Sequence, residues 1–196
     1  MPIQKYVYAS SSSVYGDHVP LPMRETAYLQ PLSPYGVSKL AAEHLGNLYA
    51  ANYGVPAVSL RYFTVYGPRQ RPDMGFQRFL TAVAKGEPVT IYGDGEQTRD
   101  FTFVSDIVAA NLAAAERGVS GTVYNIGGGS RVTLNHVLSL IERVTGKTVT
   151  IHREPEQKGD MRHTYADTSL ARRELEFAPR VSLESGLEQQ YRWLVR

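Results

Sequence analysis

The chain has 196 residues and a net charge of +2 at neutral pH, with 42% hydrophobic and 20% charged residues. These values are typical of a globular protein with a sizeable core, and so weak a charge argues against a nucleic-acid or anionic membrane surface. The absence of cysteine excludes disulfides and thiolate metal sites. Because the sequence has neither an apolar run long enough for a membrane span nor a signal-peptide pattern, we expect a cytoplasmic protein.

Strands and helices are expected to alternate along the chain, which is the pattern of an α/β fold. Ser33-Pro34 marks the start of the first long helix, and Gly54 marks its end. Thr133 and Ser182 are candidate N-caps of two later helices. The predicted strands span residues 5–9, 57–62, 89–92, 122–126 and 148–152, and the predicted helices span residues 34–53, 76–85, 105–117, 133–145 and 182–194.

A tyrosine and a lysine stand four residues apart at the start of the first predicted helix. Positions four apart share a helix face, so the Lys39 ammonium can lie beside the Tyr35 phenol and lower its pKa. A phenol tuned in this way can exchange a proton near neutral pH. Upstream, residues 10–13 are all serine, and a hydroxyl from this run could share that proton with a substrate alcohol. Taken alone, the pair is more often an exposed helix turn and the serine run a solvated loop.

Three further motifs follow in order: LRYFTVYGP at 60–68, IYGDGEQTRDF at 91–101 and YNIGGG at 124–129. Together with the tyrosine–lysine pair and the serine run, they resemble the extended short-chain dehydrogenase/reductase family, specifically its NAD-dependent nucleotide-sugar epimerases and dehydratases. The resemblance runs from Lys5 to about Leu194. It implies an α/β fold in which part of a Rossmann-like parallel sheet is combined with a smaller α/β substrate-binding part.

The resemblance also implies two interleaved parts. Residues 1–63 with 102–128 would form the nucleotide-binding sheet that carries the catalytic residues, and residues 64–101 with 129–196 would bind the sugar nucleotide. Members of the family bind the dinucleotide pyrophosphate at a Gly-x-x-Gly-x-x-Gly turn, and these 196 residues contain no such turn. The tri-glycine at 127–129 is instead expected to end a strand and open a loop. The chain therefore resembles the C-terminal portion of such an enzyme, and we expect it to be inactive alone.

The family pattern assigns catalytic roles to three residues. Aligned on Val-Tyr-Gly at 14–16, Ser11 takes the position of the catalytic hydroxyl. Tyr35 would be the base and acid at the sugar 4-hydroxyl, and Lys39 would tune it. The resemblance further implies that NAD contacts Tyr35, Lys39 and Tyr62.

The two residues after the catalytic hydroxyl indicate the reaction. The 4,6-dehydratases of the family have Asp-Glu there, which supply the acid and base that eliminate water. This chain has Ser12 and Ser13. The absence of the acidic pair favours epimerisation, in which a hydride leaves C4, the 4-keto sugar rotates, and the hydride returns to the other face.

The implied sugar-nucleotide site combines hydroxyl and charged groups. Arg99 matches the family arginine that grips the substrate pyrophosphate, a role suited to a planar guanidinium. Thr64 stands where the family often has Asn, and with Arg71 it is similar to UDP-glucuronate 4-epimerases, in which a hydroxyl and an arginine can hold a sugar carboxylate. The substrate-binding residues implied by the resemblance are Ser11, Thr64, Arg71, Arg99, Asp160 and Arg162.

The sequence therefore predicts NAD-dependent 4-epimerisation of a UDP-sugar of the UDP-glucose/UDP-galactose type. One alternative is a UDP-glucuronate 4-epimerase, and another is a non-catalytic product that binds a sugar nucleotide or a partner protein. We expect a homo-oligomer with no nucleic-acid or membrane partner. The five histidines show no metal-ligand spacing, so no metal is expected.

Overall fold

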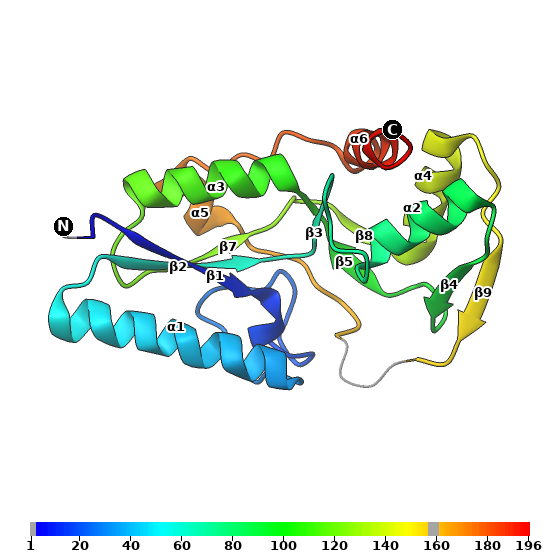
Figure 1. Ribbon diagram of the computed structural model, residues 1–196. Helices are drawn as coiled ribbons and strands as arrows, with labels where there is room; N and C mark the ends of the chain where they lie inside the picture. Colours follow the sequence, from blue (N-terminus) through cyan, green and yellow to red (C-terminus); the bar gives the residue numbers. More distant parts are fainter. Residues whose placement is uncertain (1–2, 157–160) are drawn as a thin grey trace.

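The computed structural model describes residues 3–156 and 161–196. Its centre is a parallel sheet of β1 (Tyr6–Ser11), β2 (Ala57–Tyr62) and β7 (Val123–Ile126), in the order β1-β2-β7. Figure 1 shows α1 (Pro34–Tyr53) on one face of this sheet, and α3 (Val104–Arg117) with α5 (Ser169–Leu175) on the other. The predicted α/β class with a partial Rossmann-like sheet is thereby confirmed.

The middle strand β2 is the most deeply covered of the three. Residues 57–61 are all buried, which is expected of a parallel strand packed on both faces. In β1, Tyr6 and Ala9 are exposed, and β1 pairs with β2 alone among the described strands. The three strands run parallel, so their carboxyl ends lie at one edge of the sheet. In open α/β sheets ligands bind at this edge.

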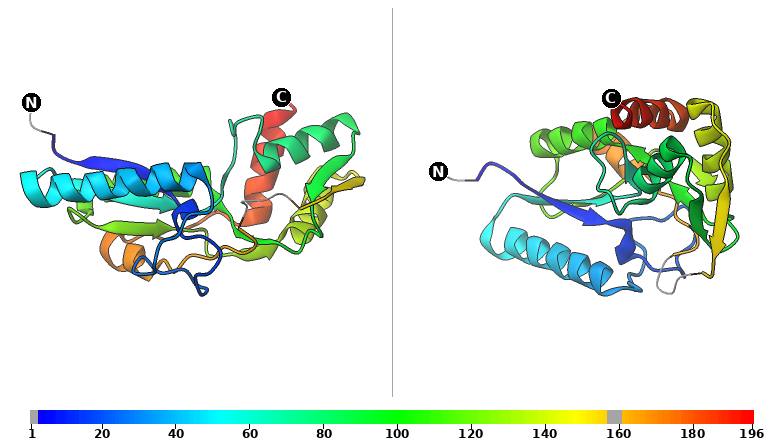
Figure 2. Two further views of the ribbon diagram at one scale, coloured as in Figure 1. Left: turned by 90° about the horizontal axis from the view of Figure 1, so that it is seen from below. Right: turned by 45° about the vertical axis from the view of Figure 1, so that its right-hand side comes forward.

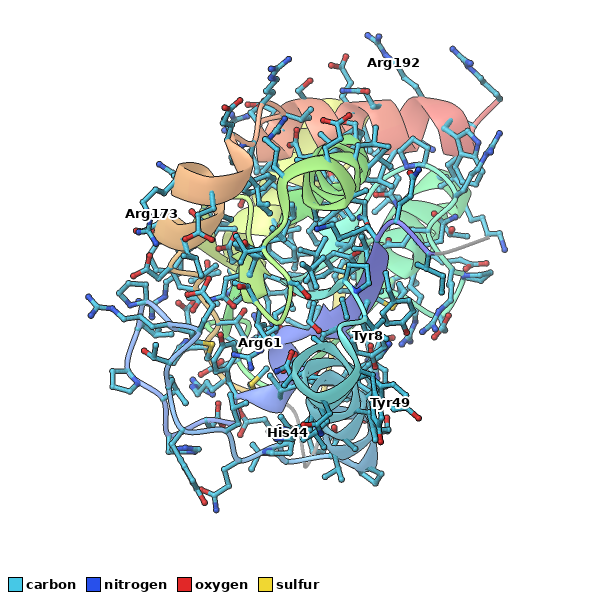
Figure 3. The ribbon with its side chains drawn as sticks, turned by 90° about the vertical axis from the view of Figure 1, so that its left-hand side faces the viewer. Tyr8, His44, Tyr49, Arg61, Arg173 and Arg192 are labelled. Carbon is cyan, nitrogen blue, oxygen red and sulfur yellow. The ribbon has the colours of Figure 1, made fainter. Side chains whose placement is uncertain are left out.

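Helix α1 begins and ends at the predicted residues. The Ser33 Oγ accepts a hydrogen bond from the Gly36 N–H at 3.1 Å, and Gly54 ends the helix with φ +66°, a conformation that costs glycine little. Of its 20 residues only Gly36 and Glu43 are buried. A Cβ at Gly36 would collide with the Ser13 carbonyl oxygen, so this glycine lets the start of α1 approach the serine run. Figure 3 shows α1 with His44 and Tyr49 on its exposed sides.

The remaining elements lie beyond the carboxyl ends of the sheet (Figures 1 and 2). Within the described residues they form two-stranded sheets of β3 (Val65–Tyr66) with β6 (Thr102–Phe103), β4 (Val89–Tyr92) with β9 (Ile151–Glu154), and β5 (Thr98–Asp100) with β8 (Arg131–Thr133). Apolar side chains of β3, β4, β6 and β8 pack with α2 (Gly75–Lys85), α4 (Leu134–Thr145) and α6 (Leu183–Leu194) in one core. None of the described helices is long and apolar enough to cross a membrane.

The predicted elements differ from the observed ones in a few places. The strand expected at 148–152 lies at Ile151–Glu154, because the Val149 N–H donates to Glu142 Oε1 at 2.8 Å and Ile151 is the first residue to pair with β4. Helix α5 was not predicted. It comes from the range assigned to sugar-nucleotide binding, yet it shares a core with residues of β7 and α3. The division into residues 1–63 with 102–128 and residues 64–101 with 129–196 stays a prediction.

The loop that follows β7 leads from the central sheet to the elements beyond its carboxyl ends, and it packs against Asp100. The Asp100 carboxylate is fully buried and accepts hydrogen bonds from the Gly129 N–H and the Ala166 N–H, both at 3.1 Å. Burial raises its pKa to about 6, although backbone N–H groups of Ala166 and of this loop lower it. A Cβ at Gly128 would overlap the Phe101 carbonyl oxygen, which explains glycine there. The tri-glycine therefore ends a strand and opens a loop, as predicted.

Candidate active site

A cavity of about 660 Å³ opens at the carboxyl ends of β1 and β2, beside the N-terminus of α1. We call it the catalytic cavity because it collects several residues that the sequence predicted to react with or hold a substrate. Its lining comprises Ser10, Ser11, Ser12, Ser13, Tyr35, residues 62–71, Met74 and Val104. Ser11, Tyr35, Tyr62, Thr64 and Arg71 are thus brought together from separate parts of the chain.

Ser11 is the last residue of β1, where the strand gives way to a 3-10 turn at Ser12–Val14. Its Oγ accepts a hydrogen bond from the Ser13 N–H at 3.2 Å and donates to the Ser13 Oγ at 3.0 Å. These bonds hold the hydroxyl at the end of the strand, on the wall of the catalytic cavity.

Tyr35 lies in the first turn of α1 and is 54% exposed. The Lys39 Nζ lies 5.6 Å from the centroid of the Tyr35 ring and 5.3 Å from that of Tyr8, within the range of a cation–π attraction. The same Nζ donates to the Ala9 carbonyl oxygen at 2.9 Å. The four-residue spacing therefore places the ammonium beside the phenol and also ties α1 to the end of β1.

Tyr62 ends β2 and pairs in register with Ser11. Its hydroxyl donates to the Asn111 Oδ1 on α3 at 2.8 Å, and burial raises its pKa. Tyr62 therefore stays protonated near neutral pH, unlike a catalytic base. It can contribute to the wall of the cavity but not to proton transfer.

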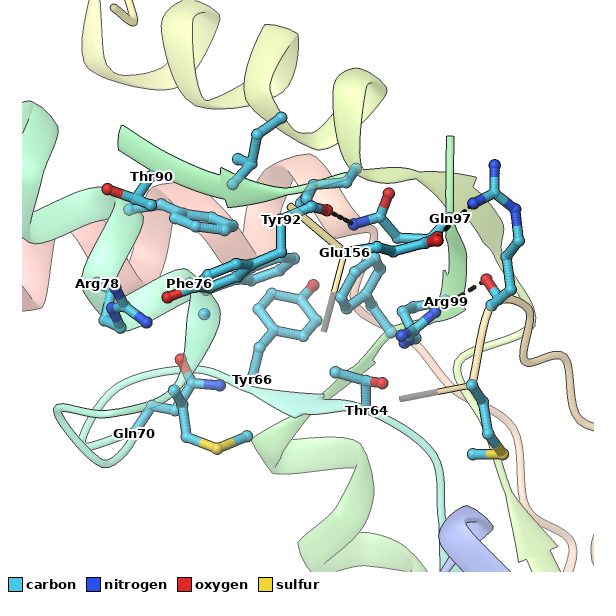
Figure 4. Close-up of a pocket in the computed structure, with 18 of the residues that line it drawn as sticks. Thr64, Tyr66, Gln70, Phe76, Arg78, Thr90, Tyr92, Gln97, Arg99 and Glu156 are labelled. Atoms are coloured by element: carbon cyan, nitrogen blue, oxygen red, sulfur yellow. Dashed lines mark hydrogen bonds and ion pairs between the residues drawn. The ribbon is translucent and has the colours of Figure 1, made fainter. Parts of the chain in front are cut away.

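A second cavity, of about 460 Å³, lies among the elements beyond the sheet. Figure 4 shows aromatic rings of Tyr66, Phe76 and Tyr92 around it, with Arg78 and Arg99 at its borders. We call it the aromatic cavity. Flat rings bordered by guanidinium groups suit a ligand with a planar apolar portion and an anionic portion.

The two cavities adjoin, because Thr64, Tyr66, Gln70 and Met74 line both. Gln70 is held in place from two sides: its Oε1 accepts from the Gln77 N–H at 3.0 Å, and its Nε2 donates to the Val65 carbonyl oxygen at 2.9 Å. A ligand longer than either cavity would pass along this shared wall.

Two of the arginines predicted to bind substrate, Arg99 and Arg162, line the aromatic cavity. The Arg99 Nη1 donates to the Arg162 carbonyl oxygen at 3.1 Å. The Arg162 guanidinium is paired with Asp94 and with Glu156, each at 2.6 Å. The Glu96 N–H and Arg162 hold the pKa of Asp94 below its usual range. The Arg99 guanidinium therefore contacts the backbone of Arg162, whereas the Arg162 guanidinium pairs with two carboxylates.

Arg71 lines the catalytic cavity and not the aromatic one. Its guanidinium pairs with Asp73, with Nη2 to Oδ2 at 2.9 Å, and both side chains are largely exposed. Thr64 belongs to the shared wall. Asp160, which was also predicted to bind substrate, lies outside the described residues.

Sequence reasoning missed the rings of the aromatic cavity. Phe76 and Phe79 recur at helical spacing on α2, a pattern that equally predicts a packed core. Tyr92 ends β4 and shows no motif of its own. Only the tertiary arrangement distinguishes an aromatic ring on a cavity wall from one in the core. No group of histidine and acidic residues within ranges 3–156 and 161–196 could hold a metal ion.

Comparison with known proteins identifies one family of relatives. Residues 1–127 match the model of the NAD dependent epimerase/dehydratase family. The uncharacterized UDP-glucose epimerase YtcB of Bacillus subtilis is 44% identical, over 98% of this chain and 61% of YtcB. UDP-glucuronate 4-epimerase of Thermodesulfobacterium geofontis is 37% identical, over 97% of this chain and 59% of that protein.

Solved structures show the same relationship. UDP-glucuronic acid 4-epimerase from Bacillus cereus, in complex with UDP-glucuronic acid and NAD, is 42% identical with a TM-score of 0.95, over 100% of this chain and 62% of that one. MoeE5, in complex with UDP-glucuronic acid and NAD, is 45% identical with a TM-score of 0.93, over 98% of this chain and 65% of that one. The chain thus spans about three fifths of the length of the curated relatives that it matches. It belongs to the NAD dependent epimerase/dehydratase family.

Proposed function

We propose that this chain carries the catalytic and sugar-nucleotide-binding residues of a UDP-glucuronate 4-epimerase. The observation that carries the proposal is the junction of the two cavities: an aromatic, arginine-bordered cavity adjoins one lined by Ser11 and Tyr35. The names of the relatives from T. geofontis and B. cereus support this substrate class.

The arrangement suggests how a UDP-sugar would lie. The rings of the aromatic cavity would take the uracil, and Arg99 with Arg162 would bind the diphosphate through charge-assisted hydrogen bonds. The sugar would then pass Thr64 into the catalytic cavity. The larger volume there, about 660 Å³, leaves room for the sugar to present either face while the nucleotide stays bound.

The chain's own groups supply the proton chemistry. Tyr35 would take the proton of the sugar 4-hydroxyl and return it after the face is exchanged, and Ser11 would share that proton through its hydroxyl. The Lys39 ammonium, close to the Tyr35 ring, would stabilise the phenolate that forms.

The residues present fit the nicotinamide end of NAD. The Lys39 ammonium has three donors, and its bond to the Ala9 carbonyl oxygen uses one, which leaves donors for ribose hydroxyls beside the exposed Tyr35. NAD, when bound, supplies the hydride acceptor and donor for C4. The 196 residues contain no Gly-x-x-Gly-x-x-Gly turn for the pyrophosphate, so they fit only this end of the cofactor.

Thr64 and Arg71 favour glucuronate over glucose. Both line the catalytic cavity, where a hydroxyl and a guanidinium can bind the C6 carboxylate that glucuronate has and glucose lacks. The Arg71–Asp73 pair is exposed, and such pairs contribute little stability, so a substrate carboxylate can replace Asp73 at small cost. UDP-glucose remains a second candidate substrate, because YtcB is named a UDP-glucose epimerase and MoeE5 is also described in complex with UDP-glucose.

The test compares kcat/KM for UDP-glucuronate and UDP-glucose in the NAD-loaded enzyme, completed with the Gly-rich segment of a homologous epimerase if the 196 residues alone do not retain NAD. Arg71→Ala should lower kcat/KM for UDP-glucuronate by about 10- to 100-fold, since a hydrogen bond between charged groups contributes roughly 1.5–3 kcal/mol. It should leave the value for UDP-glucose nearly unchanged.

Arg69→Ala is the matched control, because Arg69 lines the same cavity with the same charge. It should affect the two substrates equally. An Arg71→Ala enzyme that loses both activities to the same extent would contradict the glucuronate assignment, and a wild type without turnover of either substrate would contradict the epimerase itself.

A further inference from the structure

A row of buried polar side chains crosses the sheet one residue before the catalytic position. Ser10, Arg61 and Asn125 face one another in register on β1, β2 and β7, and none is more than 3% exposed. Successive residues of a strand alternate between faces, so these three point to one face and Ser11 points to the other. Polar groups so deeply buried are costly unless every one has a partner.

Glu43 of α1 provides the main partner of this row. The Arg61 Nε donates to the Glu43 Oε1 at 3.0 Å, and the Arg61 Nη2 donates to Oε2 at 2.8 Å. The Ser10 hydroxyl donates to the same carboxylate. Glu43 and Arg61 are 2% and 3% exposed. Glu43 continues the four-residue spacing of Tyr35 and Lys39, so the three side chains follow one another along α1.

The other end of Arg61 reaches the loop that follows the catalytic serine. The Arg61 Nη1 donates to the Tyr15 hydroxyl at 2.9 Å, and that hydroxyl donates to the Asn125 Oδ1 at 2.7 Å. Burial raises the pKa of Tyr15 to about 12, which keeps the hydroxyl a donor. Among the described residues, the buried side-chain polar atom without a partner is Thr102 Oγ1, which lies outside this network.

A network of this kind contributes little net stability but can determine position. A buried ion pair is often no more stabilising than apolar side chains of similar volume. Helix α1 has no apolar buried side chain of its own, since only Gly36 and Glu43 are buried. The half-buried Leu40 packs against the apolar cluster around Val14 and Phe63. The buried polar anchors of the helix are the Glu43 bonds, and the bond from Lys39 to Ala9 adds a further tie to β1.

We infer that Glu43 and Arg61 are positioning residues for the proposed epimerisation: they fix α1, which carries Tyr35, against the end of β1, which carries Ser11. The inference rests on the proposed function, because the two hydroxyls must act on one substrate oxygen. A displacement of about 1 Å at reacting groups can reduce the rate by roughly 100-fold. Neither residue touches the substrate in this arrangement.

Ser10→Ala tests the inference with the least disturbance, because it removes the bond between β1 and Glu43 and keeps the ion pair. In the NAD-loaded enzyme, we expect kcat to fall by about 10-fold while KM for UDP-glucuronate stays within about 2-fold, since the aromatic cavity is untouched. Ser10→Thr, which restores the hydroxyl, should recover most of the rate. Ser59→Ala is the matched control, because Ser59 is a buried serine on the same sheet face, two residues before Arg61.

The double variant Glu43→Leu/Arg61→Met replaces the ion pair by apolar side chains and should still unfold cooperatively. Its kcat should fall by roughly 100-fold with KM little changed. The positioning role would be overturned if Ser10→Ala kept the kcat of the wild type. It would also be overturned if Ser10→Ala and Ser59→Ala lost kcat to the same extent. If the wild type binds a UDP-sugar without turnover, the proposed function fails instead, and the inference falls with it.

Discussion

Tyr35 and Glu43 have different proposed roles in the site, and they differ in burial. Tyr35 is 54% exposed at the start of α1, whereas Glu43, two helical turns further on, is 2% exposed and bonded to both β1 and β2. The group proposed to react is therefore accessible to solvent, while the group proposed to position its helix is buried. Substitutions at the two positions should therefore lower activity for different reasons: one removes the reacting hydroxyl, and the other removes the bonds that position the helix.

Tyr35→Phe should reduce turnover by roughly 100- to 10,000-fold in the NAD-loaded enzyme, because it removes the hydroxyl that exchanges the proton. Binding of UDP, measured by calorimetry, should be nearly unchanged, since Tyr35 lines only the catalytic cavity. Arg99→Ala should show the reverse pattern, with weakened UDP binding. If Tyr35→Phe weakened UDP binding and Arg99→Ala did not, the roles assigned to the two cavities would be wrong.

Asp100 predicts a pH dependence of stability. Its pKa is raised by burial from 3.8 to about 6, so the folded state binds the proton more tightly than the unfolded state does. The resulting stabilisation, of order 3 kcal/mol, is present below pH 4 and is lost as the pH rises through about 6. Asp100→Asn lacks this titration. Urea unfolding at pH 4, 5.5 and 7 gives the free energy of unfolding of both proteins, and the excess of the wild type over Asp100→Asn should decrease as the pH rises. An excess that increases with pH would mean that the backbone N–H bonds to Asp100 outweigh its burial.

Among the described elements, α1 carries more of the exposed large apolar side chains than any other. Val37, Leu45 and Leu48 lie along one side of the helix and are each more than half exposed. Nearby, one edge of β1 has no strand partner among the described residues. A free strand edge and an apolar helix face are both places where another copy can pair or pack.

We therefore expect the isolated 196-residue chain to self-associate, as proposed from its sequence. Leu48→Glu should shift sedimentation toward the monomer without lowering the urea midpoint, because Leu48 is exposed in the single chain. Leu112→Glu, on the exposed side of α3, is the control and should have a smaller effect. A wild type that sediments as a monodisperse monomer at tens of micromolar would refute the expectation.

The sequence predicted the long elements well and the short ones poorly. Helix α1 and strands β2 and β4 have the predicted bounds, because their caps, apolar runs and flanking glycines are local signals. The two-residue strands β3 and β6 exist only through pairing with each other, which no local pattern records. The motifs predicted that Ser11, Tyr35 and Lys39 would meet, whereas the partnership of Glu43 with Arg61 emerged only from packing.

At the scale of the whole molecule, the proposed binding of the nucleotide and that of the cofactor would depend on different parts. The rings and arginines of the aromatic cavity are all within the chain, while the sequence contains no Gly-rich pyrophosphate turn. Calorimetry of the isolated chain should therefore detect UDP but find NAD weaker than about 1 mM, which corresponds to roughly 4 kcal/mol. Submillimolar NAD affinity, or epimerase activity above that of Tyr35→Phe, would contradict the expectation of an inactive isolated chain.

The wall shared by the two cavities indicates which part of the chain would determine the sugar that the proposed site accepts. A nucleotide held in one compartment acts as a tether that keeps the sugar at high effective concentration in the next, so the sugar itself needs few contacts. The residues of the shared wall and Arg71 all come from one stretch, residues 64–74. Under the proposed function, exchange of this stretch alone would change the sugar that is accepted, while the residues proposed to bind the diphosphate and to transfer the proton stay the same.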